Sequence, residues 1–175
     1  FDTSLQRLKR DNVDCLLLHD ANNIIDHPAK ADIREQLLKL KSLGLVKRIG
    51  VSVYTPEQVI QAAETFPIDV VQAPMNLLDQ RFCQSEISHF FTQHHIKLHT
   101  RSAFLQGLLL MNSNMRPAYF CQFNSQLMQV DDLAQRYRTS KLTIALAFLV
   151  QNSLVKSNLE KIVVGCCSAE QLEQI

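Results

Sequence analysis

The sequence has little net charge, few glycines and no long apolar segment, and each shortage excludes a class of protein. Eighteen basic residues oppose 17 acidic ones, for a formal net charge of +1, so the chain lacks the basic footprint of nucleic-acid binding. No apolar run approaches the roughly 20 residues that a membrane span needs. We therefore expect a protein that binds neither nucleic acid nor a membrane.

The start of the sequence lacks two further features. Phe1 is followed by polar residues, so no secretory signal is visible and the cytoplasm is the expected location. No initiator methionine is present, which suggests that residue 1 is not a natural start. The chain has 175 residues, of which 46% are hydrophobic, and this is enough for one sizeable core. We expect a single domain over residues 1–175.

The sequence also lacks the patterns that bind metals. Its five cysteines are odd in number and form no C-x-x-C pair, which favours free thiols in a reducing compartment. The adjacent Cys166 and Cys167 would point to opposite faces of a strand, which argues against a shared metal. Four histidines lie close together in sequence, at His89, His94, His95 and His99. No carboxylate or thiolate completes a ligand set with them, so a solvated helix end is the better interpretation and no metal site is expected.

An apolar segment that ends in a histidine organises the rest of the chain. Residues 13–18 (VDCLLL) are almost continuously apolar, as in a strand buried on both faces of a parallel sheet. His19 follows at the carboxyl end of this strand, where α/β proteins bind ligands. An imidazole there can form a hydrogen bond with a carbonyl-type ligand. A histidine that only faces solvent is an equally good interpretation of this segment alone.

Strands and helices alternate along the chain. The apolar segments that predict strands are residues 13–18, 46–53, 68–72, 96–100 and 161–165. The periodic segments that predict helices are residues 4–10, 31–43, 85–94, 125–137 and 142–151. Residues 142–151 are apolar nearly all round, which predicts a well-buried helix. Residues 20–28 and 104–124 are expected to be loops.

Two further helices are marked by their first residues. Thr55 can cap a helix, Pro56 suits its first turn, and Gln58 completes a capping box. Ser168 and Gln171 have the same spacing and predict a second capping box.

Five strands that alternate with helices predict an α/β fold, and two architectures fit it. One is a five-stranded open sheet, which needs only this length. The other is a (β/α)8 barrel, of which this chain would supply a part, because a whole barrel needs roughly 250 residues. A glycine-rich phosphate loop after the first strand would favour the open sheet, but the four glycines form no G-x-G. Periodicity alone leaves both architectures open.

Five stretches, taken together and in order, resemble the aldo-keto reductase family. They are SLQRL with VDCLLLH (residues 4–8 and 13–19), LGLVKRIGVS (43–52), VVQAPMNLLDQR (70–81), RSAFLQGLL (101–109) and IVVGCCSAEQL (162–172). They resemble barrel strands four to eight with their flanking segments. The resemblance implies an α/β fold in which the chain is the C-terminal part of a (β/α)8 TIM barrel, a partial barrel of about five parallel strands without the N-terminal strands.

The resemblance also implies an activity: hydride transfer from the reduced form of an NADP or NAD cofactor to a small-molecule aldehyde or ketone, with a tyrosine as proton donor. His19 matches the family's histidine that hydrogen-bonds and orients the substrate carbonyl. Ser52 and Gln72 match residues that hold the nicotinamide carboxamide, which suits a hydroxyl and an amide at strand ends. Without the family, polar caps at strand ends would be the better interpretation of these two. The other implied cofactor positions are Arg101 against the nicotinamide ring, Ser102, Leu105 and Gln106 near the pyrophosphate, and Gly165, Ser168 and Gln171 at the adenosine end.

The chain departs from the family pattern at several points. Val53 stands where many members carry asparagine, and residues 164–167 (VGCC) hold no cation for a 2′-phosphate, so the choice between NAD and NADP stays open. The family's catalytic aspartate, tyrosine and lysine lie on segments before strand four, and Tyr54, Tyr119 and Tyr137 do not match the donor position. We therefore expect this chain alone to be inactive and to belong to a larger reductase. The alternative is a non-catalytic nicotinamide-binding or regulatory protein.

Overall fold

A parallel sheet of five strands forms the centre of the computed structural model, which describes residues 1–175. The strands are β1 (Val13–Leu18), β2 (Val46–Ser52), β3 (Val70–Pro74), β4 (Lys97–Arg101) and β5 (Leu159–Ile162). They lie in the order β1-β2-β3-β4-β5, and each is parallel to the next. A doubly wound sheet reverses its strand order at a switch point, whereas a barrel keeps the order of the sequence. The structure therefore confirms the α/β fold of a partial barrel and excludes the doubly wound alternative.

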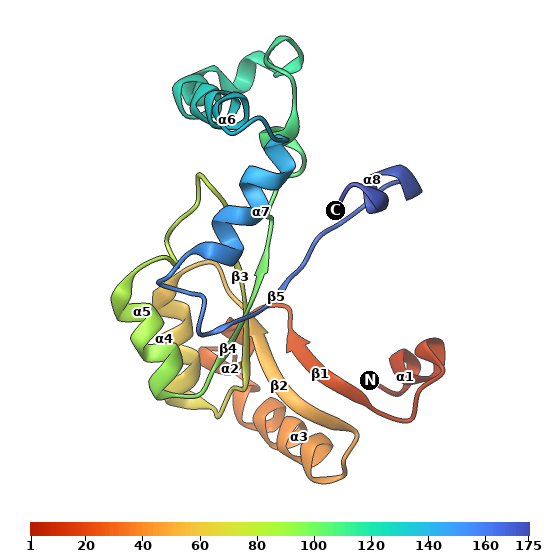
Figure 1. Cartoon of the computed structure of the whole chain (residues 1–175). Coiled ribbons are helices and arrows are strands. Elements are labelled where there is room, and N and C mark those ends of the chain that lie inside the picture. Colours follow the sequence, from red (N-terminus) through yellow and green to blue (C-terminus); the bar gives the residue numbers. More distant parts are fainter.

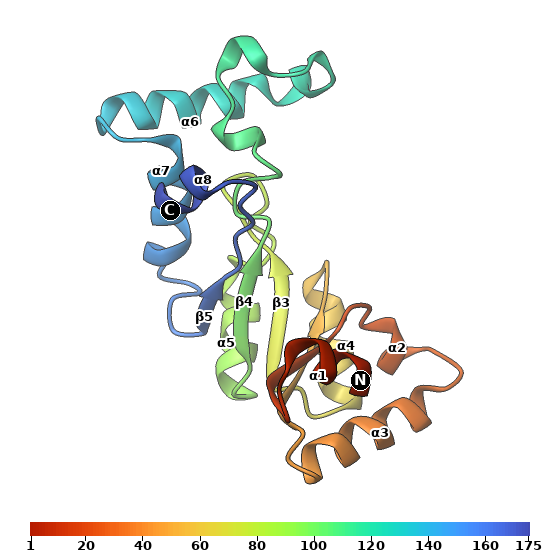
Figure 2. The same cartoon turned by 90° about the vertical axis from the view of Figure 1, so that its right-hand side faces the viewer.

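The chain has eight α-helices, and those that contribute to the core cover one side of the sheet (Figure 1). The eight helices are α1 (Asp2–Leu8), α2 (Asn22–Ile25), α3 (Lys30–Ser42), α4 (Pro56–Thr65), α5 (Ser85–Gln93), α6 (Asn124–Arg136), α7 (Lys141–Gln151) and α8 (Ala169–Glu173). Figure 2 shows α6 lying across the molecule, beyond the carboxyl ends of β3 and β4. No helix combines the length and the apolar character that crossing a membrane would require.

One large apolar core lies between the sheet and its helices. It contains Val51, Val71 and Leu98 from three adjacent strands, together with side chains of α2, α3, α4, α5 and α7. Because side chains alternate along a strand, the residues between these core positions point to the opposite face. Ser52 and Gln72, which follow Val51 and Val71, therefore lie on the face that these helices do not cover.

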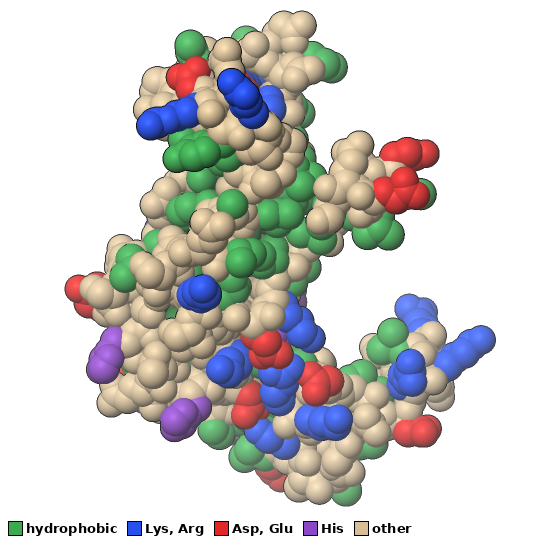
Figure 3. Space-filling view, in the orientation of Figure 1, with side chains coloured by type: hydrophobic (Ala, Val, Ile, Leu, Met, Phe, Trp, Pro, Cys, Tyr) green, Lys and Arg blue, Asp and Glu red, His purple; other side chains and the backbone are tan.

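The uncovered face of the sheet curves into a hollow, which Figure 3 shows between α8 and α1. Arg48 on β2 donates to Glu160 on β5 at 2.7 Å and to Asp14 on β1 at 2.5 Å. β2 and β5 are not neighbours in the sheet, so one side chain can reach β5 from β2 only if the sheet is strongly curved. This curvature is that of part of a barrel.

The first strand is less buried than its sequence predicts. Asp14 is exposed and the other five residues of β1 are only half-buried, so the prediction of burial on both faces is wrong. β1 is an edge strand with a neighbour on one side only, which leaves its side chains partly in water. β5, the other edge, has no buried residue either.

Three predictions about local structure also need correction. The predicted loop 20–28 contains α2, and the predicted loop 104–124 contains the 3₁₀ helices η1 (Leu108–Leu110), η2 (Ser113–Met115) and η3 (Ala118–Phe123). Such short helices are too brief to show an α-helical periodicity. Only Ala145 and Leu149 of α7 are buried, because α7 packs on α6 and η1 while part of its surface stays in solvent.

The two predicted capping boxes have different outcomes. The Thr55 hydroxyl accepts from the Gln58 N–H at 3.4 Å, and the Gln58 side chain accepts from the Thr55 N–H at 3.3 Å, so the first box is confirmed. At α8, the Ser168 hydroxyl accepts from the Gln171 N–H at 3.3 Å. The Gln171 side chain, however, accepts from the N–H of Cys167 rather than of Ser168, so only half of the second box forms.

Two expectations about cysteine and histidine side chains were wrong in detail. Cys166 and Cys167 lie beyond the end of β5 and are not strand residues, because pairing with β4 ends at Ile162. All five cysteines are unpaired. His99 is buried within β4 and does not belong to a solvated helix end. No three His, Cys, Asp or Glu side chains are grouped as metal ligands would be.

Candidate active site

Ser52 and Gln72 lie side by side where two neighbouring strands approach their carboxyl ends. Ser52 is the last residue of β2 and pairs in register with Gln72 on β3. Paired residues point to the same face of a sheet, and the strands are about 4.7–4.9 Å apart. Ser52 is buried and Gln72 is half-buried. A hydroxyl and a primary amide together offer donors and acceptors, so this pair can hold an amide group of a ligand.

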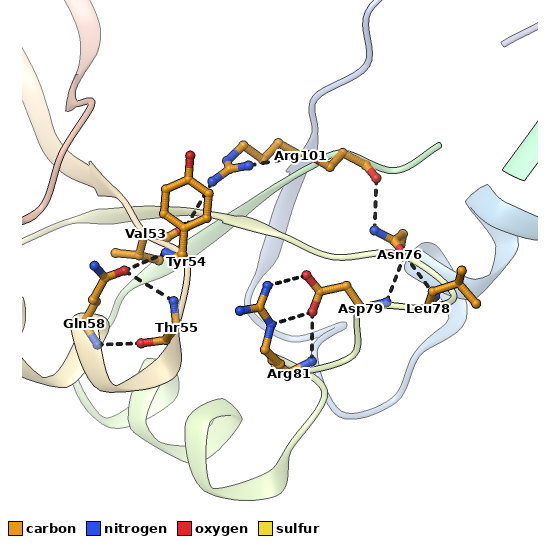
Figure 4. A network of polar contacts seen from close by, with 10 residues as sticks. Val53, Tyr54, Thr55, Gln58, Asn76, Leu78, Asp79, Arg81 and Arg101 are labelled. Carbon is orange, nitrogen blue, oxygen red and sulfur yellow. Dashed lines mark hydrogen bonds and ion pairs between the residues drawn. The ribbon is translucent and has the colours of Figure 1, made fainter. Parts of the chain in front are cut away.

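Arg101 lies two residues further toward the carboxyl ends of the strands than Gln72, on the same face of the sheet. It is the last residue of β4 and pairs with Pro74, two residues beyond Gln72. Its side chain reaches across β3, because Nη2 donates to the carbonyl oxygen of Val53 at 3.2 Å. The guanidinium carbon lies 4.6 Å from the centre of the Tyr54 ring. Figure 4 shows the two side chains beside each other. Arg101 forms no ion pair with a carboxylate.

The loop after β4 has an unusual backbone. Ser102, Leu105 and Gln106 have positive φ angles of 60°, 48° and 54°, and Gly107 follows at 90°. Residues with a Cβ adopt this conformation rarely, and such strain collects at ligand sites. The N–H groups of Phe104 and Gln106 donate to no protein acceptor. Backbone N–H groups freed in this way can bind an anion, so the loop has donors to offer a phosphate.

Asn76, which was not among the predicted site residues, holds this loop in place. The side chain is buried, and its Nδ2 donates to the carbonyl oxygen of Ser102 at 3.2 Å. Its Oδ1 accepts from the N–H groups of Leu78 and Asp79, each at 2.9 Å (Figure 4). One amide thus ties the loop after β3 to the loop after β4. An asparagine directly after a strand is a frequent turn residue, which is the signal that could have identified it.

A bidentate ion pair stabilises the same loop. Arg81 donates to Asp79 from Nε at 2.8 Å and from Nη2 at 2.6 Å (Figure 4). The hydrogen bonds from Arg81 hold the pKa of the Asp79 carboxyl below its usual range. Each charge of this pair is therefore neutralised by the other.

His19 lies at the carboxyl end of β1, on the same edge of the sheet. The preceding residue, Leu18, pairs with Val51, so His19 is level with Ser52. Its imidazole is exposed and forms no hydrogen bond within the protein. The ring is free to contact a ligand at this edge, and its role in orienting a carbonyl stays a prediction.

The three predicted residues at the adenosine end are not brought together with the others. Gly165, Ser168 and Gln171 lie beyond β5 in exposed positions. Figure 1 shows the segment that ends in α8 projecting away from the sheet. Their side-chain hydrogen bonds stay within the segment, and none reaches Ser52 or Gln72.

A buried histidine completes the row that Ser52 and Gln72 begin. His99 pairs in register with Gln72, and its Nε2 lies 3.6 Å from Glu160 Oε2 without a hydrogen-bond partner. Burial lowers the pKa of His99, although the Glu160 carboxylate opposes this shift. The hydrogen bond from Arg48 in turn lowers the pKa of Glu160. This arrangement is not visible in the sequence, because its residues lie on strands that are distant along the chain.

The candidate site is an open hollow, and two sizeable cavities lie elsewhere. A cavity of about 540 Å³, lined in part by Phe66, Ile68 and His95, lies among the connections at the amino-terminal end of the strands. Another of about 660 Å³ lies between Leu77 and the α6–α7 pair, and Phe148 contributes to its lining. Parallel barrels bind ligands at the carboxyl ends of their strands, so the first cavity is at the wrong end.

Three features define the class of protein to which the chain belongs. They are parallel strands in sequence order, a layer of helices on one face of the sheet, and polar side chains at the carboxyl ends of the strands. The chain is a segment of a (β/α)8 barrel, with its candidate site at the end where such barrels bind ligands. The family model described as the aldo/keto reductase family matches residues 1–175, and the chain belongs to this family. A search of curated proteins found no match.

Solved structures of the family share the fold. A glycerol dehydrogenase, AKR11B4 from Gluconobacter oxydans, is 21% identical with a TM-score of 0.69, over 99% of this chain and 60% of that one. The aldo-keto reductase AKR11C1 from Bacillus halodurans, in its holo form, is 20% identical with a TM-score of 0.72, over 99% and 57%. The thermostable aldo-keto reductase Tm1743, in complex with the inhibitor epalrestat, is 19% identical with a TM-score of 0.72, over 98% and 56%. The chain thus spans less than two thirds of the length of these proteins.

Proposed function

We propose that the whole protein containing this chain is an NAD(P)H-dependent oxidoreductase that reduces an aldehyde or ketone to an alcohol. The Ser52–Gln72 pair at the carboxyl ends of β2 and β3, in a chain of the aldo/keto reductase family, carries the proposal. The similarity to a glycerol dehydrogenase supports chemistry between an alcohol and a carbonyl. The partner is a small carbonyl compound, and the proposed location is the cytoplasm.

In this proposal the chain binds and orients the cofactor. The Ser52 hydroxyl and the Gln72 amide hold the carboxamide of the nicotinamide, and Arg101 packs against the ring. The free N–H groups around Leu105 and Gln106 bind the pyrophosphate. The bound cofactor supplies the hydride. The adenosine end is assigned to Gly165, Ser168 and Gln171, and the lack of a cation in residues 164–167 leaves both NAD and NADP as candidates.

His19 orients the substrate in the proposed reaction. Its ring is unpartnered and level with Ser52, so a nitrogen of the imidazole can donate to the carbonyl oxygen of a substrate beside the nicotinamide. This hydrogen bond fixes the direction of the carbonyl group and stabilises the charge that develops on its oxygen.

The proposal assigns the proton donor to residues outside this chain. Tyr54 holds Arg101 with its ring, whereas Tyr119 and Tyr137 lie on η3 and at the end of α6. We infer that residues 1–175 form a single domain, that this domain is the C-terminal part of a reductase barrel, and that it is inactive alone.

The second candidate function is non-catalytic binding of a nicotinamide cofactor by a regulatory protein. One observation favours it: the position after Ser52 carries Val53, whose carbonyl oxygen already accepts from Arg101. This position therefore offers a bound carboxamide no side-chain donor or acceptor. Turnover distinguishes the two candidates, because both require cofactor binding.

Fluorescence titration of the whole protein with NADPH and with NADH tests the shared claim. We expect Gln72→Ala and Ser52→Ala each to weaken binding by roughly 2–10-fold, the loss of one net hydrogen bond. Gln61→Ala, at an exposed position of α4, is the matched control and should leave the affinity unchanged. Wild-type protein that binds neither cofactor would refute the proposal.

A further inference from the structure

Arg101 carries a charge that no neighbouring carboxylate neutralises. Arg48, Arg81 and Arg116 each form an ion pair with an aspartate or glutamate. Arg101 is half-buried at the end of a strand and forms none. The Asp79 carboxylate is close enough to feel the charge of Arg101, but it is already paired with Arg81 in bidentate geometry. The candidate site therefore contains one uncompensated positive charge.

The structure fixes the plane of this guanidinium. Tyr54 lies against one side at 4.6 Å, and the carbonyl oxygen of Val53 accepts from Nη2 at 3.2 Å. Tyr54 is itself held by the start of α4, since its N–H donates to Gln58 Oε1 at 2.7 Å (Figure 4). A planar guanidinium has two faces, and a tyrosine ring covers only one of them. A ligand ring would stack on the face opposite the tyrosine.

The position of Arg101 brings it close to any ring anchored on Ser52 and Gln72. Arg101 pairs with Pro74, which is two residues beyond Gln72 on the same face. Two residues of strand advance the chain by about 6.6–6.8 Å, which is comparable with the size of a substituted six-membered ring. A ring whose carboxamide binds the Ser52–Gln72 pair can thus reach the level of the guanidinium.

We propose that Arg101 makes the site prefer the reduced nicotinamide over the oxidised one. This inference rests on the proposed function and adds to it the redox form that the site selects. The oxidised ring is a pyridinium with one positive charge, whereas the reduced dihydropyridine ring is neutral. A guanidinium beside the ring repels the first and not the second. An aromatic side chain in the same place would instead attract the pyridinium through its ring face.

The consequence concerns the direction of the reaction. A reduced cofactor that gives its hydride to the carbonyl carbon of the substrate would become a pyridinium next to Arg101. The charge repulsion then weakens the binding of the oxidised cofactor and favours its release. Arg101 acts here as a residue that sets the specificity of the site for one redox form, and Tyr54 is the positioning residue that lies against it.

The test measures dissociation constants of the whole protein for the oxidised and the reduced form of the same cofactor. We expect the ratio of the two constants, oxidised over reduced, to fall about tenfold in Arg101→Gln, which removes the charge. Arg101→Lys keeps the charge and should keep most of the ratio. Arg136→Gln is the matched control. Arg136 on α6 also lies beside a tyrosine, with its guanidinium carbon 5.9 Å from the centre of the Tyr137 ring, but it is away from the sheet. Raising the ionic strength should lower the ratio in wild type and not in Arg101→Gln.

Each result is decisive. A ratio that is the same in wild type and Arg101→Gln, with both forms still bound, would overturn the inference and leave the proposed function intact. This includes the case in which Arg101→Gln loses the same affinity for both forms, because a merely structural role of Arg101 predicts that outcome. Wild type that binds neither form would refute the proposed function and the inference with it. Unfolding temperatures of all variants show whether a lost affinity reflects a lost fold.

Discussion

The charge states of His99 and Glu160 are set by their surroundings rather than by their residue types. Burial lowers the pKa of His99, and Arg48 lowers the pKa of Glu160 through a hydrogen bond at 2.7 Å. The two carboxylates that Arg48 contacts raise its own pKa. Near neutral pH the row beside Gln72 therefore contains a neutral imidazole, an ionised carboxylate and a guanidinium. Arg48 is thus neutralised by carboxylates, whereas Arg101 at the end of β4 forms no ion pair.

We expect the protein to lose stability as the pH falls below about 6.5, and His99→Asn to remove part of that loss. The folded pKa of His99 lies below its ordinary value of 6.5, so the unfolded chain takes up the proton first. Acid in this window then favours the unfolded state. Unfolding temperatures at about pH 7.5 and about pH 5.5 measure the effect.

The control for this experiment is His89→Asn, at an exposed position of α5, which should behave as wild type. Glu160 contributes to stability in a separate pH range. Because its pKa is lowered in the folded protein, the stability that it provides is lost only as the pH falls below its ordinary pKa of 4.5. Equal losses of unfolding temperature in wild type and His99→Asn would contradict the assignment.

Individual helices and strands could be predicted from the sequence where interactions between residues close together in the chain determine them. The parallel strands, the α3 and α5 helices and the Thr55 capping box depend on periodicity and on capping, which act within a few residues. The half-burial of β1 and α7 depends on which neighbours the sheet provides, so periodicity could not reveal it. The short helices α2 and η1–η3 have no stripe that a pattern could detect.

The candidate site was predictable only in part. Ser52, Gln72 and Arg101 were recognised through the family resemblance. Without it, polar caps at strand ends are the better interpretation of Ser52 and Gln72. The structure supports the Ser52–Gln72 pair by register. Asn76 and His99 were missed, since their contacts join strands or loops that are distant in sequence.

We expect Gly50→Ala to destabilise the protein by about 1–3 kcal/mol, as overpacking does. Gly50 lies on β2 between β1 and β3, where a Cβ would collide with the carbonyl oxygen of Val70 and the side chain of Leu17. Denaturant unfolding measures the change. Gly165→Ala is the control, because nothing lies near its Cβ position and its stability should match wild type. A neutral Gly50→Ala would mean that the strands are less closely packed than the structure shows.

Asn76→Ala should loosen the loop after β4. The substitution removes three hydrogen bonds from a buried amide and leaves their partners unsatisfied, at a cost of about 1–3 kcal/mol for each buried group. We expect faster amide hydrogen exchange in residues 102–107 and weaker binding of the cofactor. Asn112→Ala, at an exposed position, should change neither. Unchanged exchange in Asn76→Ala would remove Asn76 from the account.

The molecule as a whole exposes more surface than a compact protein of its mass. Its accessible surface is 10981 Å², whereas a compact protein of 20.0 kDa exposes about 8,700 Å². The excess fits an open, curved sheet whose edge strands β1 and β5 each have a neighbouring strand on one side only. Unpaired edges of a sheet present free N–H and C=O groups to other chains.

We therefore expect the isolated chain of residues 1–175 to associate with itself as its concentration rises. Sedimentation velocity from roughly 1 to 100 μM measures the association. The apparent mass should increase with concentration because the edges of β1 and β5 can pair between molecules. A single species of 20.0 kDa over the whole range would contradict this expectation.

The most direct test of the central claim is turnover by the whole protein. Reduced cofactor is mixed with a panel of small aldehydes and ketones, and its oxidation is followed by absorbance together with the alcohol formed. The account predicts one alcohol for each cofactor oxidised, a lower rate in His19→Gln and a weaker hold on the cofactor in Gln72→Ala. Binding of the cofactor without any oxidation would contradict the reductase claim and favour the non-catalytic alternative.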